Sequence, residues 1–422
     1  MDNDPTENDY CDLAIIGAGA AGLMAGIFAA RSAPPGTKVV LLDGAKKPGA
    51  KILIAGGGRC NVTHDVVNSA DYFGGASNNT VKKILKSFSV KETTAFFKEL
   101  GVELKREDTG KLFPTTDKAR TVLDALLKAL ADAGGELRAG HRVTKLDRTP
   151  SGFEITTNHG VLASPRVILA TGGKALPSSG SDGLGYRFAE HLGHTVTQTW
   201  PALVPLVLQD GHWLTTLSGV ALDVELTLSG KSGKTLYKQP GAMLATHFGV
   251  SGPAAMDMSR HLRDYPEQAP RRLTASLLPG ESFERVEAWL MDAVREAPTV
   301  VVSTPLKRRL PDRLVEVMLR WEVGVKADLP LARLPKDDRR ALCHALTGLH
   351  LPVVGDRGFT YAEVTAGGVP MAQVQTATMA SKACAGLYLC GEVLDVDGRI
   401  GGYNFQWAWC TGRLAGLAAA AI

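Results

Sequence analysis

The chain has 422 residues, which is enough for two or three domains at about 150 residues each. Hydrophobic residues make up 45% and charged residues 21%, which is typical of a globular protein and excludes a disordered, collagenous or coiled-coil chain. The formal net charge of +4 is too small to require a nucleic acid or an anionic membrane as a partner.

Cysteine usage and the acidic start of the chain predict a cytoplasmic location. The six cysteines form no C-x-x-C pair and no metal-type pairing with histidine, so neither a disulfide framework nor a metal site is expected. The chain carries five acidic and no basic residues before Arg31, which is the opposite of a secretory signal. Residues 13–30 are uncharged, but four glycines within them favour a strand, a turn and a helix over a membrane span.

The first regular elements form a βαβ unit. Leu13–Ile16 is a short apolar run that predicts a buried parallel strand, and the alanine-rich residues 20–30 predict a packed helix. A second apolar run, Lys38–Leu42, ends at Asp43. Strand, helix and strand follow one another within the span typical of this unit.

Two amphipathic helices and a hairpin are predicted next. Ser89 and Glu92 have the spacing of a capping box before a segment that ends at Gly101, and apolar residues recur at helical spacing over 118–133. Residues 153–157 and 161–169 flank a polar turn, and the second run leads into Ala170-Thr-Gly-Gly173. We interpret this as a hairpin that feeds a core strand.

The middle of the chain has a different pattern of apolar and charged residues. Residues 203–208 and 220–228 alternate around turns, which predicts an antiparallel sheet or a small barrel. Residues 280–350 are helical in pattern, and within 301–350 ten Lys and Arg face six Asp and Glu, a net +4. We interpret this charge as a solvated surface rather than a docking face. Apolar strands return after about 355, so an α/β domain is interrupted by an insertion and completed by the C-terminal residues.

Residues 17–22 carry the clearest chemical signal. Gly17, Gly19 and Gly22 match G-x-G-x-x-G between a predicted strand and a predicted helix. The glycines permit the turn, the approach of a pyrophosphate to the helix amino terminus, and close packing of helix on strand. Asp43 lies at the end of the next strand, where a carboxylate can accept hydrogen bonds from ribose hydroxyls. The motif therefore predicts a dinucleotide site.

A late glycine-rich segment indicates that the dinucleotide is FAD. Gly391–Gly398 follows an apolar strand, and Gly401–Ala408 opens a C-terminal helix. A nicotinamide-only domain needs no such second anchor, whereas the flavin ring of extended FAD does. Free amides at a helix start attract the negative charge that the flavin gains on reduction. Asp395 is a candidate for the ribityl hydroxyls, and Asn404 for a cap or a ring contact.

Lys51–Asn61 is a third cluster. Its three consecutive glycines predict a nest of backbone amides, and Lys51 and Arg59 add positive charge suited to a pyrophosphate or an anionic flavin. Cys60 is a candidate redox thiol if its basic neighbours lower its pKa. Without a partner at C-x-x-C spacing, we favour a packed residue instead.

Together these segments resemble a known family. The resemblance lies in 16–22, 51–63, 170–173, 246–253 and 391–412, and its most specific pieces are 56–61, 364–368 and 401–408. They are similar to the three-domain bacterial FAD flavoproteins of the BaiN/YhiN type, NAD(P)/FAD-dependent oxidoreductases to which aminoacetone oxidase is also similar. The resemblance covers nearly the whole chain.

The resemblance implies an α/β fold with a discontinuous, glutathione-reductase-type FAD-binding Rossmann domain. Its two parts would span 1–195 and 351–422, with an inserted β-barrel-like domain over 196–280 and a helical domain over 281–350. It also implies which residues lie on the cofactor: Gly17, Ala20, Gly22, Asp43, Lys51, Arg59, Asn61, Val143, Gly172, Asp395, Gly402 and Asn404.

The chain departs from the family pattern at three positions. Asp43 stands where a Glu is commoner, and Ala55 and His64 stand where Ser and Asn are frequent. No second G-x-G-x-x-G with strand and helix context is present for a nicotinamide cofactor. His247 and Tyr403 are weak candidates for catalytic roles, since a lone histidine more often packs. No catalytic residue is assigned.

The expected function is that of an FAD-dependent oxidoreductase. It would exchange hydride between the flavin and a small organic substrate, in a cleft between the flavin domain and the insertion. An amine or a carbonyl compound is implied by the resemblance alone. Two alternatives stay open: a flavin-binding sensor or partner-binding protein without turnover, and an RNA-modifying flavoenzyme. We expect no nucleic-acid and no membrane partner, and the oligomeric state is unassigned.

Overall fold

A computed structural model describes residues 9–262 and 271–421. Most of the acidic start, on which part of the location prediction rests, lies outside these residues. The chain divides into two compact units, which we describe separately. Unit 1 contains residues 1–201 and 363–422, and unit 2 contains residues 202–362.

Unit 1 is built on a parallel sheet with strand order β22-β12-β2-β3-β8. These strands are β2 (Leu13–Ile16), β3 (Val39–Asp43), β8 (Glu136–Ala139), β12 (Val167–Leu169) and β22 (Leu387–Leu389). The four residues of β2 are all buried, as are the three of β12. Burial on both faces explains why these strands read as continuous apolar runs. The predicted discontinuous Rossmann-type fold is confirmed.

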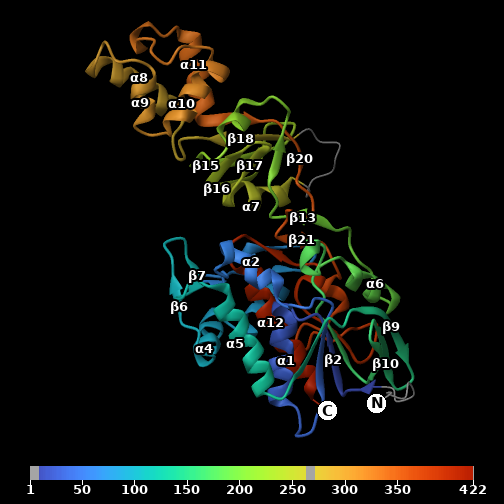
Figure 1. The fold of residues 1–422 in the computed structure, drawn as a ribbon. Coiled ribbons are helices and arrows are strands. Elements are labelled where there is room, and N and C mark those ends of the chain that lie inside the picture. The colour runs from blue at the N-terminus through green and yellow to red at the C-terminus, as the bar shows by residue number, and fades with distance from the viewer. Residues whose placement is uncertain (1–8, 263–270, 422) are drawn as a thin grey trace. The chain divides into compact units, whose positions relative to one another are not determined.

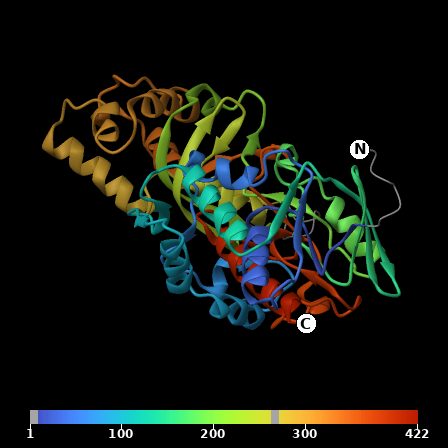
Figure 2. The same ribbon diagram turned by 60° about the horizontal axis from the view of Figure 1, so that its bottom comes forward.

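Two helices from opposite ends of the chain lie side by side against this sheet (Figures 1 and 2). They are α1 (Ala20–Ser32) and α12 (Tyr403–Ala420). Their close approach depends on glycine in α12: a methyl group on Gly412 would lie 2.4 Å from Ala21 O, and one on Gly416 would lie 2.3 Å from Ala25 O. The C-terminal helix therefore packs on the first helix of unit 1, beside the predicted dinucleotide motif.

The predicted helices of unit 1 are present with the expected ends. Ser89 caps α4, and its capping box with Glu92 is formed. Apolar residues of α5 face the core, where they meet α1. The helices of this part of the chain are α2 (Ala50–Gly58), α3 (Asn78–Ser87), α4 (Val90–Glu99), α5 (Ala119–Asp132) and α6 (Leu184–His191).

Smaller sheets complete unit 1. The predicted hairpin is formed by β10 (Gly152–Thr157) and β11 (Gly160–Ser164), and it belongs to the sheet β1-β11-β10-β9, with β1 (Asp9–Tyr10) and β9 (Val143–Thr149). Pro165 separates β11 from β12, because proline supplies no amide hydrogen to a ladder. A second small sheet has the order β4-β7-β6, with β4 (Thr63–His64), β7 (Lys111–Pro114) and β6 (Leu104–Arg106). Two short pairs are β23 (Asp397–Gly398) with β5 (Tyr72–Phe73), and β13 (Trp200–Ala202) with β21 (Val364–Ala366).

Unit 2 combines one sheet with helices over a core of its own. The sheet has the order β19-β18-β15-β16-β17-β14-β20, and its strands pair antiparallel throughout the described residues. Its strands are β14 (Leu206–Leu208), β15 (Ala221–Ser229), β16 (Thr235–Thr246), β17 (Gly249–Ser251), β18 (Arg272–Ser276), β19 (Leu349–Leu351) and β20 (Val353–Asp356). Its helices are α7 (Pro253–His261), α8 (Phe283–Glu296), α9 (Ser303–Lys307), α10 (Asp312–Met318) and α11 (Lys336–Gly348).

The segments for which we expected separate barrel-like and helical domains share one hydrophobic core in unit 2. Leu226 of the sheet and Leu290 and Leu314 of the helices belong to the same buried cluster. Throughout the part of the chain that the structure describes, no helix has the length and apolar character needed to cross a membrane.

Candidate cofactor site

The carboxyl ends of the parallel strands of unit 1 meet at one edge of the sheet. β2 runs into Gly17, β3 ends with Asp43, β12 runs into Ala170-Thr171, and β22 runs into Cys390-Gly391. Open α/β sheets bind ligands at this edge, where neighbouring connections diverge. The predicted glycine-rich segments are thus brought together although they are far apart in the chain.

The three glycines of the first loop have different surroundings. Gly17 has a φ of +103°, and a methyl group there would lie 2.4 Å from Ala170 O. A methyl group on Gly22 would lie 1.8 Å from Gly17 O. At Gly19 an added methyl group meets nothing within 4 Å. The first and third glycines therefore allow close packing, while the second leaves open space at the amino terminus of α1.

Asp43 holds the glycine loop in place. Its Oδ2 accepts a hydrogen bond from Ala18 N at 2.7 Å, and its Oδ1 accepts one from Ala45 N at 2.8 Å. This arrangement accounts for an aspartate where a longer glutamate is commoner, because the short side chain reaches the loop backbone. Each carboxylate oxygen retains a second lone pair, so a contact with ribose hydroxyls remains compatible with these bonds.

Lys51 is paired with a residue from the other end of the chain. Its Nζ lies 2.6 Å from Glu392 Oε2, and the two side chains are 23% and 18% exposed. Glu392 Oε1 also accepts a hydrogen bond from Thr365 N at 3.0 Å. The first turn of α2 is therefore joined to the turn after β22. Glu392 and Thr365 could not be predicted from the sequence, because a long-range contact leaves no local sequence pattern.

Arg59 is engaged by side chains of the β4-β7-β6 sheet and its turns. Its Nη1 lies 2.6 Å from Glu107 Oε1 and 3.6 Å from Asp117 Oδ1. Its guanidinium carbon lies 4.0 Å from the centre of the Phe113 ring. The positive charge that we considered for a pyrophosphate or a flavin is thus balanced by these carboxylates.

Two buried polar atoms near the loops lack a partner within the described structure. Asn61 is 7% exposed, and its Oδ1 accepts no hydrogen bond from the described residues. Thr171 Oγ1 is likewise buried and unpaired there. Buried polar groups without partners are rare and costly. Together with the open space at Gly19, these atoms fit a polar group that is not part of the polypeptide, as a dinucleotide would be.

The amino terminus of α12 forms a second anchor. Gly402 caps the helix with a φ of +95°, and a methyl group on it would lie 2.6 Å from Thr63 C. Asn404 closes the preceding loop: its Oδ1 accepts from Gly398 N at 2.8 Å, and its Nδ2 donates to Gly398 O at 2.9 Å. Asn404 therefore holds the loop before α12, while no side chain makes a capping hydrogen bond to the start of this helix, and the ring contact stays a prediction.

The other four predicted residues have the following positions in unit 1. Asp395 is 5% exposed and accepts a hydrogen bond from Gly75 N at 3.2 Å. Val143 is buried at the start of β9. Gly172 has a φ of +71°, and a methyl group on it would lie 2.8 Å from Ser181 Oγ. Ala20 begins α1.

The two helix termini are offset along a common direction. Gly412 lies against Ala21 and Gly416 lies against Ala25, so α1 and α12 run parallel. Helix α12 begins at Tyr403, nine residues before Gly412. Ala21 is one residue from the start of α1, so the offset is eight residues, and at 1.5 Å per residue the amino terminus of α12 lies about 12 Å beyond that of α1. An elongated dinucleotide with one end at α1 would have its other end near α12.

Cys60 is not arranged as a redox thiol. Its side chain is fully buried, and burial raises its pKa from 9.0 to about 12. The packed residue that we favoured from the sequence agrees with this raised pKa, and the lowering of the pKa by Lys51 and Arg59 does not occur; both cations are paired with carboxylates. Cys60 also adopts a φ of +62°. It is a packed residue in a tight turn.

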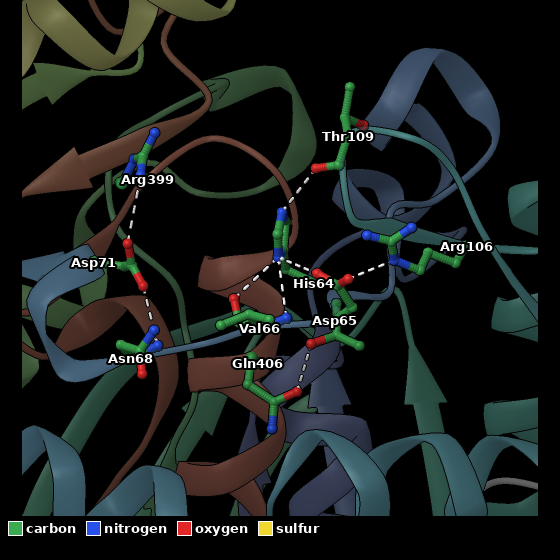
Figure 3. A network of polar contacts seen from close by, with 10 residues as sticks. His64, Asp65, Val66, Asn68, Asp71, Arg106, Thr109, Arg399 and Gln406 are labelled. Atoms are coloured by element: carbon green, nitrogen blue, oxygen red, sulfur yellow. Dashed lines mark hydrogen bonds and ion pairs between the residues drawn. The ribbon is translucent and has the colours of Figure 1, made fainter. Parts of the chain in front are cut away.

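A polar network surrounds the amino terminus of α12 (Figure 3). His64 lies between Thr109 O, 3.0 Å from its Nε2, and Val66 O, 3.0 Å from its Nδ1. Its ring stacks on Tyr403 at 5.0 Å. Thr63 Oγ1 donates to Gln406 Oε1 at 2.7 Å, which ties β4 to α12. His247, the other catalytic candidate, is exposed in the turn between β16 and β17 of unit 2.

Comparisons with known proteins show the family to which the chain is similar. Residues 11–418 match the model of the HI0933-like protein Rossmann domain family. The 3-dehydro-bile acid delta(4,6)-reductase of Clostridium scindens is 35% identical over 410 residues, 97% of this chain and 98% of that protein. The ribosomal RNA dihydrouridine synthase of Escherichia coli is 33% identical over 400 residues, 94% of this chain and 95% of that protein.

A solved structure shares the fold. The 3-ketosteroid-delta4-(5alpha)-dehydrogenase of Rhodococcus jostii, in complex with 4-androstene-3,17-dione, superposes with a TM-score of 0.53 at 16% identity. The superposition covers 99% of this chain and 98% of that one. At this identity the likeness concerns the fold alone.

Proposed function

Because this chain belongs to the HI0933-like Rossmann domain family, we propose that it binds FAD and reduces a carbon–carbon double bond conjugated to a carbonyl group in a small organic molecule. It is a flavin-dependent oxidoreductase. FAD as the particular flavin and the conjugated carbonyl compound as substrate are the steps that we add.

The offset between the amino termini of α1 and α12 is the observation that supports FAD over a shorter nucleotide. Both termini direct unpaired backbone amides and a partial positive charge outward. The first suits a pyrophosphate, and the second suits the pyrimidine side of a flavin. A separation of about 12 Å, from an offset of eight helical residues, would leave the ribityl chain to span the distance between them.

We assign the residues that would hold FAD to two groups. Around α1, the amides near Gly19 and Ala20 would bind the pyrophosphate, and Asp43 would hold the loop and contact the ribose. Around α12, Asn61 Oδ1 would accept a hydrogen bond from the flavin, and Gly402 would present its amide. The remaining predicted residues would line the site or would hold its loops in place: Gly17, Gly22, Lys51, Arg59, Val143, Gly172, Asp395 and Asn404.

FAD, when bound, supplies a two-electron hydride donor and acceptor. The chain contributes binding, orientation and exclusion of water. Tyr72, Trp407 and Trp409 are buried beside the start of α12 and surround it with apolar surface. The Nε1 of Trp409 donates to Val62 O at 2.9 Å, which fixes the turn that carries Asn61. These contacts would keep the ring half of the site rigid and dry.

The substrate class rests on the names of two relatives. The bile acid enzyme is named for reducing double bonds conjugated to a 3-oxo group, and dihydrouridine is uridine without the double bond next to its carbonyl. Both reactions add a hydride to one carbon and a proton to its neighbour. We favour the small enone because the chain carries a net charge of only +4.

Anaerobic reoxidation tests this proposal. The purified protein is loaded with FAD, reduced with one equivalent of dithionite and mixed with a 3-oxo-Δ4 steroid. We expect the flavin absorption to return and the steroid to gain two hydrogens by mass spectrometry. Failure to reoxidise with any enone, while dioxygen still reoxidises the flavin, would rule out this substrate class.

An RNA substrate is the second candidate, since two ribosomal RNA dihydrouridine synthases are each 33% identical to this chain. The same reoxidation assay with uridine-containing ribosomal RNA fragments distinguishes it from the enone. RNA binding should also weaken steeply across a salt series. The sensor alternative receives no support, because these relatives are named as enzymes.

A further inference from the structure

Lys111 lies near the amino terminus of α12 and has no charge partner among the described residues. It is in β7, directly opposite His64 of β4 in the antiparallel register. Opposite residues of such a pair project from the same face. A methyl group on Gly401 would lie 3.5 Å from Lys111 Cε and 3.7 Å from His64 Cδ2. The end of the lysine side chain is therefore close to the loop that opens α12.

The neighbouring cations are all neutralised, whereas Lys111 is not. Lys51 pairs with Glu392, Lys105 with Asp117, and Arg106 with Asp65. The ammonium group of Lys111 has neither an ion pair nor a hydrogen bond among the described residues. Asp65, the carboxylate nearest in sequence to His64, is occupied by Arg106 and by His64 Nδ1 at 3.0 Å.

An unpaired cation at this place is unfavourable by itself. The amino terminus of a helix carries a partial positive charge, so a lysine there is repelled rather than stabilised. A negative group located between the two would remove this cost. Asn61 Oδ1 is buried and unpaired in the described structure, and Asn61 lies two residues before Thr63, which is close to Gly402 at the start of α12. This atom independently indicates that a ligand completes this region.

We propose that the Lys111 ammonium raises the reduction potential of the bound flavin. The inference rests on the proposed FAD binding. On reduction the flavin takes up two electrons and one proton, and the remaining negative charge resides on its pyrimidine half. Lys111 and the amides of α12 would face that charge together. Lys111 is thus a residue that tunes the cofactor, and His64 positions it by fixing the opposite strand.

The test measures the flavin itself. Wild type, K111M, K111Q and K111R are loaded with FAD and reduced slowly in the presence of a reference dye of known potential. We expect the equilibrium constant for reduction to fall about tenfold in K111M and K111Q, which is about 30 mV for a two-electron couple. K111R keeps the charge and should stay within twofold of the wild type.

Sulfite provides a second readout, because its addition to oxidised flavin also leaves negative charge on the pyrimidine half. Its dissociation constant should rise about tenfold in K111M, a difference of about 1.4 kcal/mol. The matched control is K105M, which removes a lysine of the same small sheet that is paired with Asp117. K105M should leave both values within twofold.

The outcomes separate this inference from the proposed function. If K111M and K111Q bind FAD with unchanged potential and unchanged sulfite affinity, the role of Lys111 is wrong while FAD binding stands. If the wild type does not take up FAD, both are overturned. A tenfold change in K105M as large as that in K111M would also overturn the inference, because it would reflect overall charge.

Discussion

Gly17, Gly19 and Gly22 belong to one motif, yet an added methyl group meets different surroundings at each. At Gly17 and Gly22 it would collide with backbone oxygens, and at Gly19 it would meet open space. Asp43 and Ala18 then fix the loop by a hydrogen bond of 2.7 Å. Close packing and the proposed ligand binding thus involve separate glycines, so they can be tested separately.

Gly19→Ala should separate folding from cofactor binding. Gly19 has a φ of −80°, which alanine adopts freely, so the free energy of unfolding should change by less than about 1 kcal/mol. The methyl group would occupy the space for a pyrophosphate, and we expect the FAD dissociation constant to rise at least tenfold. Gly17→Ala should instead destabilise the fold by about 2 kcal/mol, because of its φ of +103°. Urea unfolding and FAD titration measure both; loss of stability in Gly19→Ala with intact FAD binding would contradict the assignment.

Buried thiols make stability depend on alkaline pH. The pKa of Cys60 is raised by burial from 9.0 to about 12, so the unfolded thiol loses its proton first. The folded state then holds more protons than the unfolded state, and stability falls as the pH rises from about 9 towards 12. By pH 10 this loss is about 1 kcal/mol for one thiol. Cys60→Ala should therefore lose less stability than the wild type between pH 8 and pH 10 in urea unfolding; equal losses would show that Cys60 ionises normally when folded.

The residue types of the proposed cofactor site could be predicted, but their partners could not. Gly19, Asp43 and Asn61 stand in local motifs whose chemistry is readable. Glu392 and Lys111 carry no such motif, because their roles follow from contacts with segments far away in the chain. For the same reason the sequence could not reveal that Arg59 and Lys51 are already balanced by carboxylates.

At the scale of elements, the contact between α1 and α12 brings the two ends of the chain together. Strands β2, β12 and β22 were predictable from apolar runs bounded by glycine, and α4 from its capping box. The pairing of strands and the parallel packing of α1 and α12 were not, since both depend on tertiary contacts. Glycine is a poor helix former, so helical propensity does not explain why α12 contains glycines.

Gly412→Ala and Gly416→Ala should destabilise unit 1. The added methyl groups would lie 2.4 Å and 2.3 Å from backbone oxygens of α1, so the helices must separate. We expect each to cost about 1 to 3 kcal/mol in the free energy of unfolding, and to weaken FAD binding because α12 moves. Gly348→Ala is the matched control: Gly348 ends α11, and a methyl group there meets nothing within 4 Å. Thermal and urea unfolding measure these changes, and neutral α12 variants would contradict the packing argument.

At the scale of the molecule, each unit has a hydrophobic core drawn from its own residues. The core of unit 2 includes Leu226 and Leu314, and that of unit 1 includes Leu23 and Trp409. β14 and β20 pair near the two ends of unit 2, with Leu206 opposite Asp356, so its ends are close together. The insertion in the sequence is therefore a structural unit, although its boundaries differ from the predicted 196 and 350.

We expect the fragment 202–362 to fold independently. Because its core uses no residue of unit 1, it should unfold in one cooperative transition in urea. The complementary chain, 1–201 joined to 363–422 by a short glycine linker, should still bind FAD, since the assigned residues all lie in unit 1. A fragment without a cooperative transition would show that the two units depend on each other.

The absorption spectrum of the purified full-length protein tests the central claim, that segments from both ends of the chain bind one FAD. We predict flavin absorption bands after reconstitution with FAD, and release of intact FAD into the supernatant on acid precipitation. A colourless protein that takes up no FAD would contradict the account.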